Sequence, residues 1–218
     1  MIAVAAMLFA AMPARAQYYQ IANQLPGLLS PALSGSFNYK GYVELSGVAG
    51  MGDNRANFIS LSTSQGFRYS SWFFMGAGLG LEVAMAQKPG EGEWVGGSQP
   101  DYWGHGYSTT MAMVPVFSDF RFNIGNPAST SFYIDLKLGA AWLLGGDYLR
   151  LQNGSLSNAT QFYFKPSIGL RIPVSKDNAS RAFNIGITYQ LLTSNDNWNY
   201  WDRSLTLNSF GATIGFEW

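Results

Sequence analysis

Apolar and polar residues alternate along most of this chain after about residue 36. Successive side chains of a β-strand point to opposite sides, so a period of two predicts strands with one apolar and one polar face. The pattern is plainest in residues 210–218, where the apolar positions end on Trp218 and the positions between hold glycine, threonine or glutamate. A half-buried strand of a soluble protein would show the same alternation, so one segment alone does not identify its environment.

Eight segments share this alternation and are predicted to be the strands of an all-β protein: residues 39–50, 57–67, 72–86, 109–124, 131–144, 160–174, 182–192 and 205–218. From the second strand onward the connections alternate in length. Residues 68–71, 125–130 and 175–181 are short connections, whereas 87–108, 145–159 and 193–204 are longer. Short periplasmic turns and long outer loops are typical of bacterial outer-membrane barrels. The sequence therefore predicts an eight-stranded antiparallel transmembrane up-and-down β-barrel over residues 36–218.

The polar faces of these strands carry charges of both signs. In residues 131–144, Leu136 and Leu138 share one face, while Asp135 and Lys137 share the other. Ion pairs removed from water need good geometry and further hydrogen bonds, which a narrow lumen supplies if the apolar faces meet hydrocarbon. The residues predicted to form a paired lumen network are Glu44, Glu82, Asp119, Arg121, Asp135, Lys137, Lys165 and Arg171, with Lys40 and Glu217 on the same faces. In the alternative, a soluble sandwich or lipocalin-like barrel, these charges would lie on a solvated outer face.

The composition favours the membrane barrel over the soluble one. Charged residues make up 12% of the chain, against about 25% in an ordinary soluble domain. The formal net charge is zero and no basic cluster occurs, which argues against a nucleic-acid partner. Cysteine is absent, so no disulfide holds the fold. Aromatic residues near strand ends suit the interfacial girdles of a membrane barrel, and they are Tyr39, Trp72, Phe132, Trp142, Phe162 and Trp218.

The first residues predict export. Residues 2–12 form an apolar run, and Ala14-Arg15-Ala16 then supplies the small-x-small pattern that precedes signal-peptide cleavage. The run is shorter than the about 20 apolar residues that a transmembrane helix needs. Residues 1–16 are therefore predicted to be a signal peptide that lacks the usual basic start, with a buried amino-terminal helix as the alternative. Residues 17–35 are assigned to a periplasmic segment, helical or disordered, with no assigned function.

The last strand resembles the assembly signal of bacterial outer-membrane β-barrel proteins, since aromatic or aliphatic residues at every second position lead to a terminal Trp218. Together with the eight-strand pattern, the chain is similar to small Gram-negative outer-membrane barrels of the OmpA/OmpX type. The resemblance implies a membrane scaffold with variable surface loops and roles in adhesion, defence or envelope integrity. It also implies outer-membrane lipid and lipopolysaccharide as partners, and a barrel-assembly machinery that binds the strand ending in Trp218.

Residues that could carry catalysis are scarce. The single histidine, His105, lies between glycines in the long connection 87–108. A few outer-membrane barrels are lipid-modifying enzymes, and a lipid A deacylase of that kind needs histidine, serine and a carboxylate on the lipid-facing wall. A solvated loop histidine is the simpler interpretation, so we predict no catalytic residue and no cofactor. Asp196, Asn197, Asn199 and Asp202 match no EF-hand spacing and are not assigned as a metal site.

Aromatic side chains gather in two of the predicted long loops: Trp94, Tyr102, Trp103 and Tyr107 in one, and Trp198, Tyr200 and Trp201 in the other. Such side chains offer a large contact area and a polar handle, which suits a surface glycan, lipopolysaccharide or protein ligand. Alternatively, the rings pack on one another or lie at the outer lipid interface. An eight-stranded barrel is about wide enough only for its own side chains. We therefore predict an outer-membrane barrel without an open pore and with a structural or cell-surface interaction role, the alternatives being a lipid-modifying barrel enzyme and a soluble lipocalin-like carrier.

Overall fold

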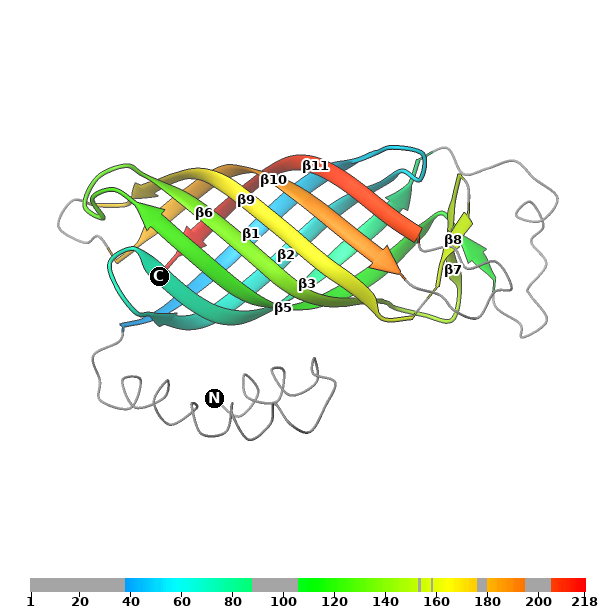
Figure 1. Cartoon of the computed structure of the whole chain (residues 1–218), viewed down its shortest axis with the longest axis horizontal. Coiled ribbons are helices and arrows are strands. Elements are labelled where there is room, and N and C mark those ends of the chain that lie inside the picture. The colour runs from blue at the N-terminus through cyan, green and yellow to red at the C-terminus, as the bar shows by residue number, and fades with distance from the viewer. Residues whose placement is uncertain (1–37, 88–105, 153, 158, 176–179, 195–204) are drawn as a thin grey trace, which may run out of the picture.

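The protein forms a closed all-β barrel in a computed structural model, which describes residues 38–87, 106–152, 154–157, 159–175, 180–194 and 205–218 (Figure 1). The eight barrel strands are β1 (Asn38–Met51), β2 (Ala56–Arg68), β3 (Phe73–Ala86), β5 (Thr110–Ile124), β6 (Ser131–Leu143), β9 (Gln161–Pro173), β10 (Ala182–Ser194) and β11 (Leu205–Glu217). Each pairs antiparallel with its neighbours in chain order, and β1 pairs with β11 to close the barrel. The predicted eight-stranded antiparallel up-and-down topology is confirmed.

The connections define two ends of the barrel, which we call the turn end and the loop end. The turn end holds the connections 69–72, 125–130 and 174–181, and the loop end holds those that follow β1, β3, β6 and β10. The first connection at the loop end, residues 52–55, is as short as a turn. Gly52 adopts a φ of 83° there, a conformation that glycine takes without the steric cost of a Cβ atom.

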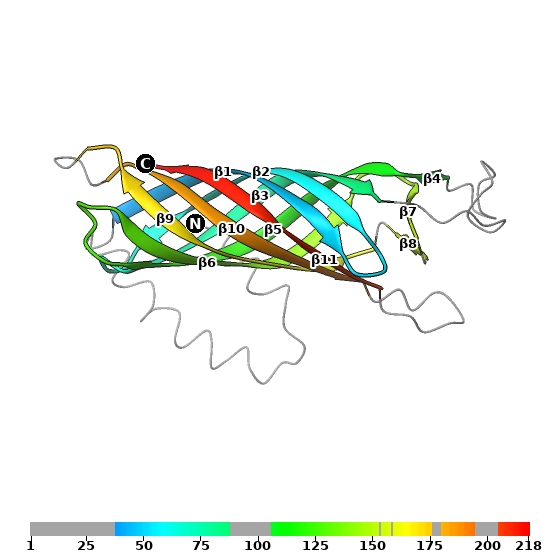
Figure 2. The same ribbon diagram turned by 90° about the horizontal axis from the view of Figure 1, so that it is seen from above.

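A small second sheet at the loop end departs from the sequence prediction. It consists of β4 (Tyr107–Ser108), β7 (Tyr148–Leu151) and β8 (Gly154–Leu156), and Figures 1 and 2 show it beyond the barrel end that lies opposite the carboxy-terminus. Residues 145–159 were predicted to be a loop without strands, which is wrong for β7 and β8. Strands of four residues or fewer are too short to show an alternation, so the pattern did not reveal them.

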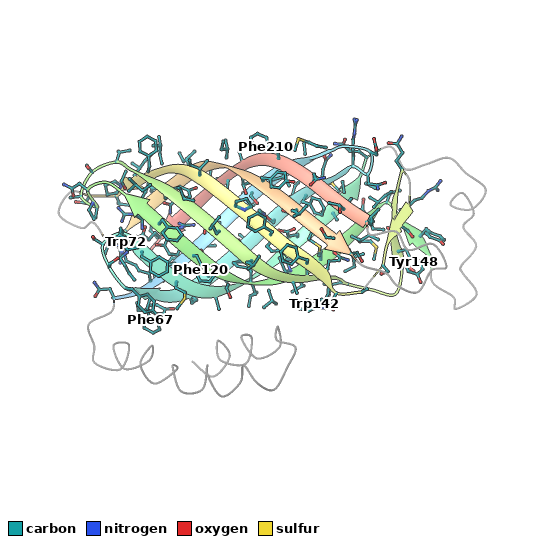
Figure 3. All side chains as sticks on the ribbon, in the orientation of Figure 1. Phe67, Trp72, Phe120, Trp142, Tyr148 and Phe210 are labelled. Carbon is teal, nitrogen blue, oxygen red and sulfur yellow. The ribbon has the colours of Figure 1, made fainter. Side chains whose placement is uncertain are left out.

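The outer wall of the barrel is predominantly apolar. Phe132, Leu138 and Ile168 are 60%, 45% and 49% exposed on strands whose alternate residues are buried. Phe67 and Phe210 project away from the wall in Figure 3. The predicted girdle residues are also exposed: Tyr39, Trp72, Phe132 and Trp218 near the turn end and Trp142 and Phe162 near the loop end. From its turn end to its centre the barrel thus places apolar faces outside and polar faces inside, the reverse of a soluble fold.

Within the described residues, no helix is both long and apolar enough to cross a membrane.

Candidate functional site: the charged interior of the barrel

The centre of the lumen holds a network of five charged side chains, Glu44, Asp119, Arg121, Asp135 and Lys137, which we call the central network. Arg121 Nη2 lies 2.5 Å from Glu44 Oε1 and 2.9 Å from Asp135 Oδ2. Lys137 Nζ lies 2.5 Å from Glu44 Oε2 and also pairs with Asp135. Two cations therefore bridge the same two carboxylates, which compensates for their removal from water.

Strand register brings the central network together. In the β5–β6 ladder, Arg121 lies opposite Asp135, and Asp119 lies opposite Lys137. The Arg121 guanidinium carbon also lies over two buried tyrosine rings, 4.0 Å from the centre of Tyr42 and 4.9 Å from that of Tyr133. Stacking of this kind suits the planar guanidinium and holds it in one orientation.

A second ion pair lies on the loop-end side of the central network. Lys165 Nζ is 3.2 Å from Glu82 Oε1 and donates to two serine hydroxyls at 2.7 Å. The Tyr163 hydroxyl donates to Glu82 Oε1 at 3.0 Å, and Gln190 Nε2 donates to Glu82 Oε2 at 2.9 Å. Both oxygens of this buried carboxylate are therefore hydrogen-bonded, as a buried charge requires.

The turn end of the lumen holds a third group, Lys40, Arg68, Arg171 and Glu217, which we call the mouth cluster. Arg68 Nη2 donates to Glu217 Oε1 at 2.5 Å, and Arg171 Nε donates to Glu217 Oε2 at 2.7 Å. Lys40 Nζ lies 3.1 Å from Glu217 Oε1 and also donates to the carbonyl of Ser180. Three cations share one carboxylate here.

All eight residues that the sequence assigns to the lumen lie inside the barrel: Glu44, Glu82, Asp119, Arg121, Asp135, Lys137, Lys165 and Arg171. Arg171 lies in the mouth cluster, and Glu82 pairs with Lys165. The other five residues form the central network. Arg68 was missed because the sequence predicts a short connection over residues 68–71. It is the last residue of β2, and its side chain is only 12% exposed.

The interior is not charged throughout, which differs from the sequence expectation. At the loop end, inward positions carry buried apolar side chains, among them Val48, Phe58, Met111, Met113, Leu143, Leu192 and Leu207. Leu149, Leu151 and Leu156 of the small sheet belong to the same cluster. We call this set the apolar plug. In residues 111–116 both faces are apolar, so the alternation there could not indicate which side chains face inward.

Most of the aromatic residues proposed to bind a surface ligand fall outside the described residues: Trp94, Tyr102, Trp103, Trp198, Tyr200 and Trp201. Tyr107 is described, and its ring centre lies 5.6 Å from that of Tyr148 across the small sheet. This ring contact joins Tyr107 to a residue outside the predicted aromatic set. His105 and the residues 196–202 also lie outside the described part of the chain.

No group of three or more metal-ligating side chains occurs in the described part of the chain. The side chains at the centre of the lumen are closed to water instead: Asp119, Arg121 and Asp135 are each 0% exposed. The chemistry that the described interior supports is charge pairing, together with anion attraction at the mouth cluster.

Comparison with known proteins agrees with this fold. No protein-family model matches the chain, and no curated protein sequence matches it. The outer membrane enzyme PagL is similar in structure, with a TM-score of 0.51, 13% identity, and coverage of 80% of this chain and 97% of PagL. Neisserial surface protein A (NspA) is also similar, with a TM-score of 0.51, 12% identity, and coverage of 82% of this chain and 95% of NspA. At these identities the likeness establishes the fold, an eight-stranded barrel of the kind found in outer-membrane proteins.

Proposed function

We propose that this chain is an integral outer-membrane β-barrel with a closed lumen and a structural or cell-surface interaction role. One observation carries the proposal: large apolar side chains are exposed over the outer wall, while the charged strand residues are buried inside. In water, an exposed apolar surface of this extent would favour aggregation. In a bilayer, the same surface is solvated by lipid, and a closed barrel satisfies every strand hydrogen bond.

The location and orientation follow from the same proposal. Residues 1–16 would direct export, the turn end would face the periplasm, and the loop end would face outward. The exposed aromatic residues near each end of the wall support this, because such girdles lie at the two membrane interfaces. Outer-membrane lipid and lipopolysaccharide would surround the barrel, and the assembly machinery would bind the strand that ends at Trp218.

The closed lumen is tested by conductance. The central network is buried and the apolar plug lies beyond it toward the loop end, so we expect no stable channel steps from the purified protein in a planar bilayer. Fractionation of the exported protein with outer membranes is the accompanying test of location. Steps of porin size would refute the closed lumen, and recovery in the soluble periplasmic fraction would refute the membrane barrel.

The surface role rests on the aromatic residues of the long loops. Trp103→Ala and Trp201→Ala should leave membrane assembly intact and weaken binding of purified lipopolysaccharide. Trp72→Ala is the matched control, since Trp72 is 55% exposed at the opposite end of the barrel. If the loop variants fail to assemble, the loop aromatics are structural. If the parent protein binds neither lipopolysaccharide nor glycans, the interaction role is wrong.

We propose a non-enzymatic role because His105 is the chain's one histidine and lies between glycines in a long connection. The test is to incubate the protein with lipopolysaccharide and measure the mass of the lipid. Loss of an acyl chain by the parent protein but not by His105→Ala would instead establish the lipid-modifying alternative.

A further inference from the structure

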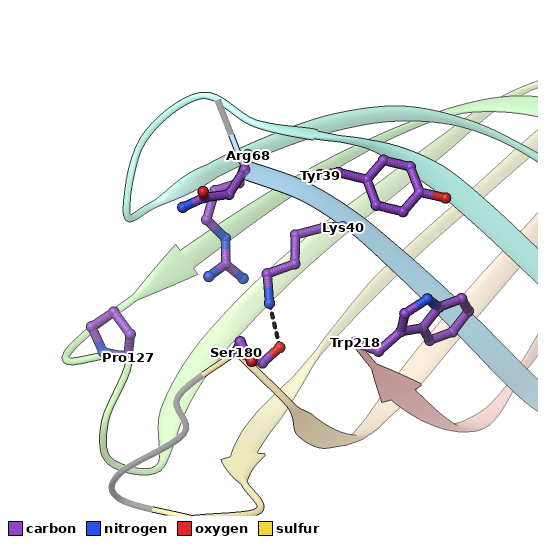
Figure 4. Close-up of a pocket in the computed structure, with 7 residues that line it drawn as sticks. Tyr39, Lys40, Arg68, Pro127, Ser180 and Trp218 are labelled. Carbon is purple, nitrogen blue, oxygen red and sulfur yellow. Dashed lines mark hydrogen bonds between the residues drawn. The ribbon is translucent and has the colours of Figure 1, made fainter. Parts of the chain in front are cut away.

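A cavity of about 510 Å³ opens at the turn end of the barrel. Its lining includes Tyr39, Lys40, Arg68, Pro127, Ser180 and Trp218, which come from three strands or strand ends and two turns (Figure 4). In Figure 4 the Lys40 and Arg68 side chains both extend from the β1 and β2 side toward Ser180 and Pro127. The cavity is therefore the mouth of the lumen, with cations on its wall.

The mouth has more positive than negative charge. The mouth cluster contains three cations and one carboxylate, Glu217, which leaves a formal excess of two positive charges. In the three turn-end connections, the sequence has one acid, Asp177, together with Lys176 and Arg181. Residues 1–43 contain no Asp or Glu, so the leading segment cannot supply a carboxylate.

Several buried polar atoms in the recess that Arg68 borders have no hydrogen-bond partner among the described residues. They are the Nε atom of Arg68, the hydroxyl of Ser131 and both amide atoms of Asn123. These three side chains line one small recess next to Arg171. This recess has no room even for a water molecule, so a ligand would lie in the adjacent 510 Å³ cavity, which shares Arg68 and Pro127 with it.

We propose that the mouth binds a phosphate group between Lys40 and Arg68. The guanidinium fork matches the spacing of phosphate oxygens, and the lysine ammonium adds a point charge. Tyr39 and Trp218 border the same cavity and are 58% and 39% exposed on the outer wall. An apolar rim beside a cationic mouth suits the phosphate headgroup of a phospholipid whose chains lie along the wall. Free phosphate is the other source of the same chemistry.

The experiment uses the full chain folded in an uncharged detergent without phosphate or sulfate. Native mass spectrometry measures binding of three probes: inorganic phosphate, a short-chain phosphatidylglycerol and an alkyl glucoside that has no phosphate. Arg68→Met and Lys40→Met remove one cation each. Arg55→Met is the matched control, because Arg55 is exposed at the loop end and its Nε donates to the Gly52 carbonyl at 2.6 Å.

The parent protein should retain phosphatidylglycerol and not the glucoside, and each mouth variant should bind about tenfold more weakly or worse, as expected for a lost charge-assisted hydrogen bond. Arg55→Met should bind as the parent does. Equal affinity for inorganic phosphate would identify free phosphate as the ligand and also supports the site. No preference for the phosphate-bearing probes in the parent, or equal loss in Arg55→Met, overturns the proposal.

Two features keep the test decisive. If Arg68→Met does not fold, Lys40→Met decides, since it leaves both arginines on Glu217. The inorganic phosphate measurement in detergent does not depend on where the protein is located. A failure of the outer-membrane proposal would therefore be distinguishable from a failure of the phosphate site.

Discussion

Replacing Leu138 by arginine tests whether the outer wall meets hydrocarbon. Leu138 lies near the middle of β6, is 45% exposed, and has Ser118 and Phe164 as its cross-strand neighbours. All five acids of the described strands face the lumen, so an arginine at this position would find no carboxylate on the wall. We expect Leu138→Arg to lower the free energy of unfolding by about 2–4 kcal/mol, the cost of a cation at the midplane of a barrel.

The matched control is Leu144→Arg, the same substitution at a 50% exposed position just past the loop end of β6. Six residues at about 3.3 Å each span about 20 Å along a strand, and a tilt of about 40° reduces this to about 15 Å along the membrane normal. The apolar band is about 25 Å tall, so Leu144 would lie at its edge, where the cost falls to about 0–1 kcal/mol. A membrane therefore predicts that Leu138→Arg lowers the free energy of unfolding more than Leu144→Arg does.

The assay is reversible denaturant unfolding in phospholipid vesicles, followed by tryptophan fluorescence. On a water-exposed wall both substitutions would change stability by about 0.5 kcal/mol or less. Equal costs at the two positions would therefore show that the wall does not cross a bilayer, whatever the interior contains. Leu136→Arg, on the same face, should behave as Leu138→Arg does.

Three further predictions concern processing, backbone packing and the lumen. Amino-terminal mass spectrometry of the exported protein should show cleavage after Ala16, and retention of the apolar run would contradict it. Gly139→Ser should lower the free energy of unfolding by about 1–3 kcal/mol through overpacking, because a Cβ atom at position 139 would lie 2.0 Å from the Val116 carbonyl oxygen. A Cβ atom at position 47 would meet nothing within 4 Å, so Gly47→Ser should be near neutral in the same vesicle assay. Lys137→Met should destabilise by about 3–5 kcal/mol, the usual cost of removing one partner of a buried ion pair, and a smaller loss would mean that water enters the lumen.

The sequence predicted the barrel strands closely because their alternation is long and its contrast is high. All eight observed strands begin and end within two residues of the predicted limits. In β6, the inward residues Ser131, Asp135 and Lys137 differ sharply in polarity from their outward neighbours. A one-residue shift in register would move every charge to the wall, so the pattern fixes both the face and the pairing.

The prediction was incomplete where this contrast disappears. Residues 111–116 are apolar on both faces, so the alternation places Met111 and Met113 inside only by continuation from Asp119 and Arg121, and it does not reveal the apolar plug that they form. The alternation alone places Gly139 on the lumen face and predicts that serine is tolerated there. The close approach of the Val116 carbonyl depends on the β5–β6 pairing, which no single segment records.

Arg68 shows a second reason why the sequence prediction was incomplete. A residue at a strand end has no alternation beyond it, so sequence alone could not distinguish a turn residue from the last inward position of β2. Its role depends on Glu217, which is 149 positions away in the chain and becomes a neighbour only when β1 pairs with both β2 and β11. The positive excess of the mouth is therefore a property of barrel closure rather than of any local motif.

The lumen side chains change in kind along the barrel axis, and their order relates the closed lumen to the proposed phosphate site. From the loop end, the lumen passes from the apolar plug to the Glu82–Lys165 pair, then to the central network and finally to the mouth cluster. The central network has three acids and two bases, a formal excess of one negative charge, whereas the mouth has an excess of two positive charges. An anion drawn to the mouth would meet carboxylates at the centre that are already paired with cations, and apolar side chains beyond them. The same arrangement that attracts a phosphate group thus opposes its passage, so the mouth would retain an anion rather than conduct it.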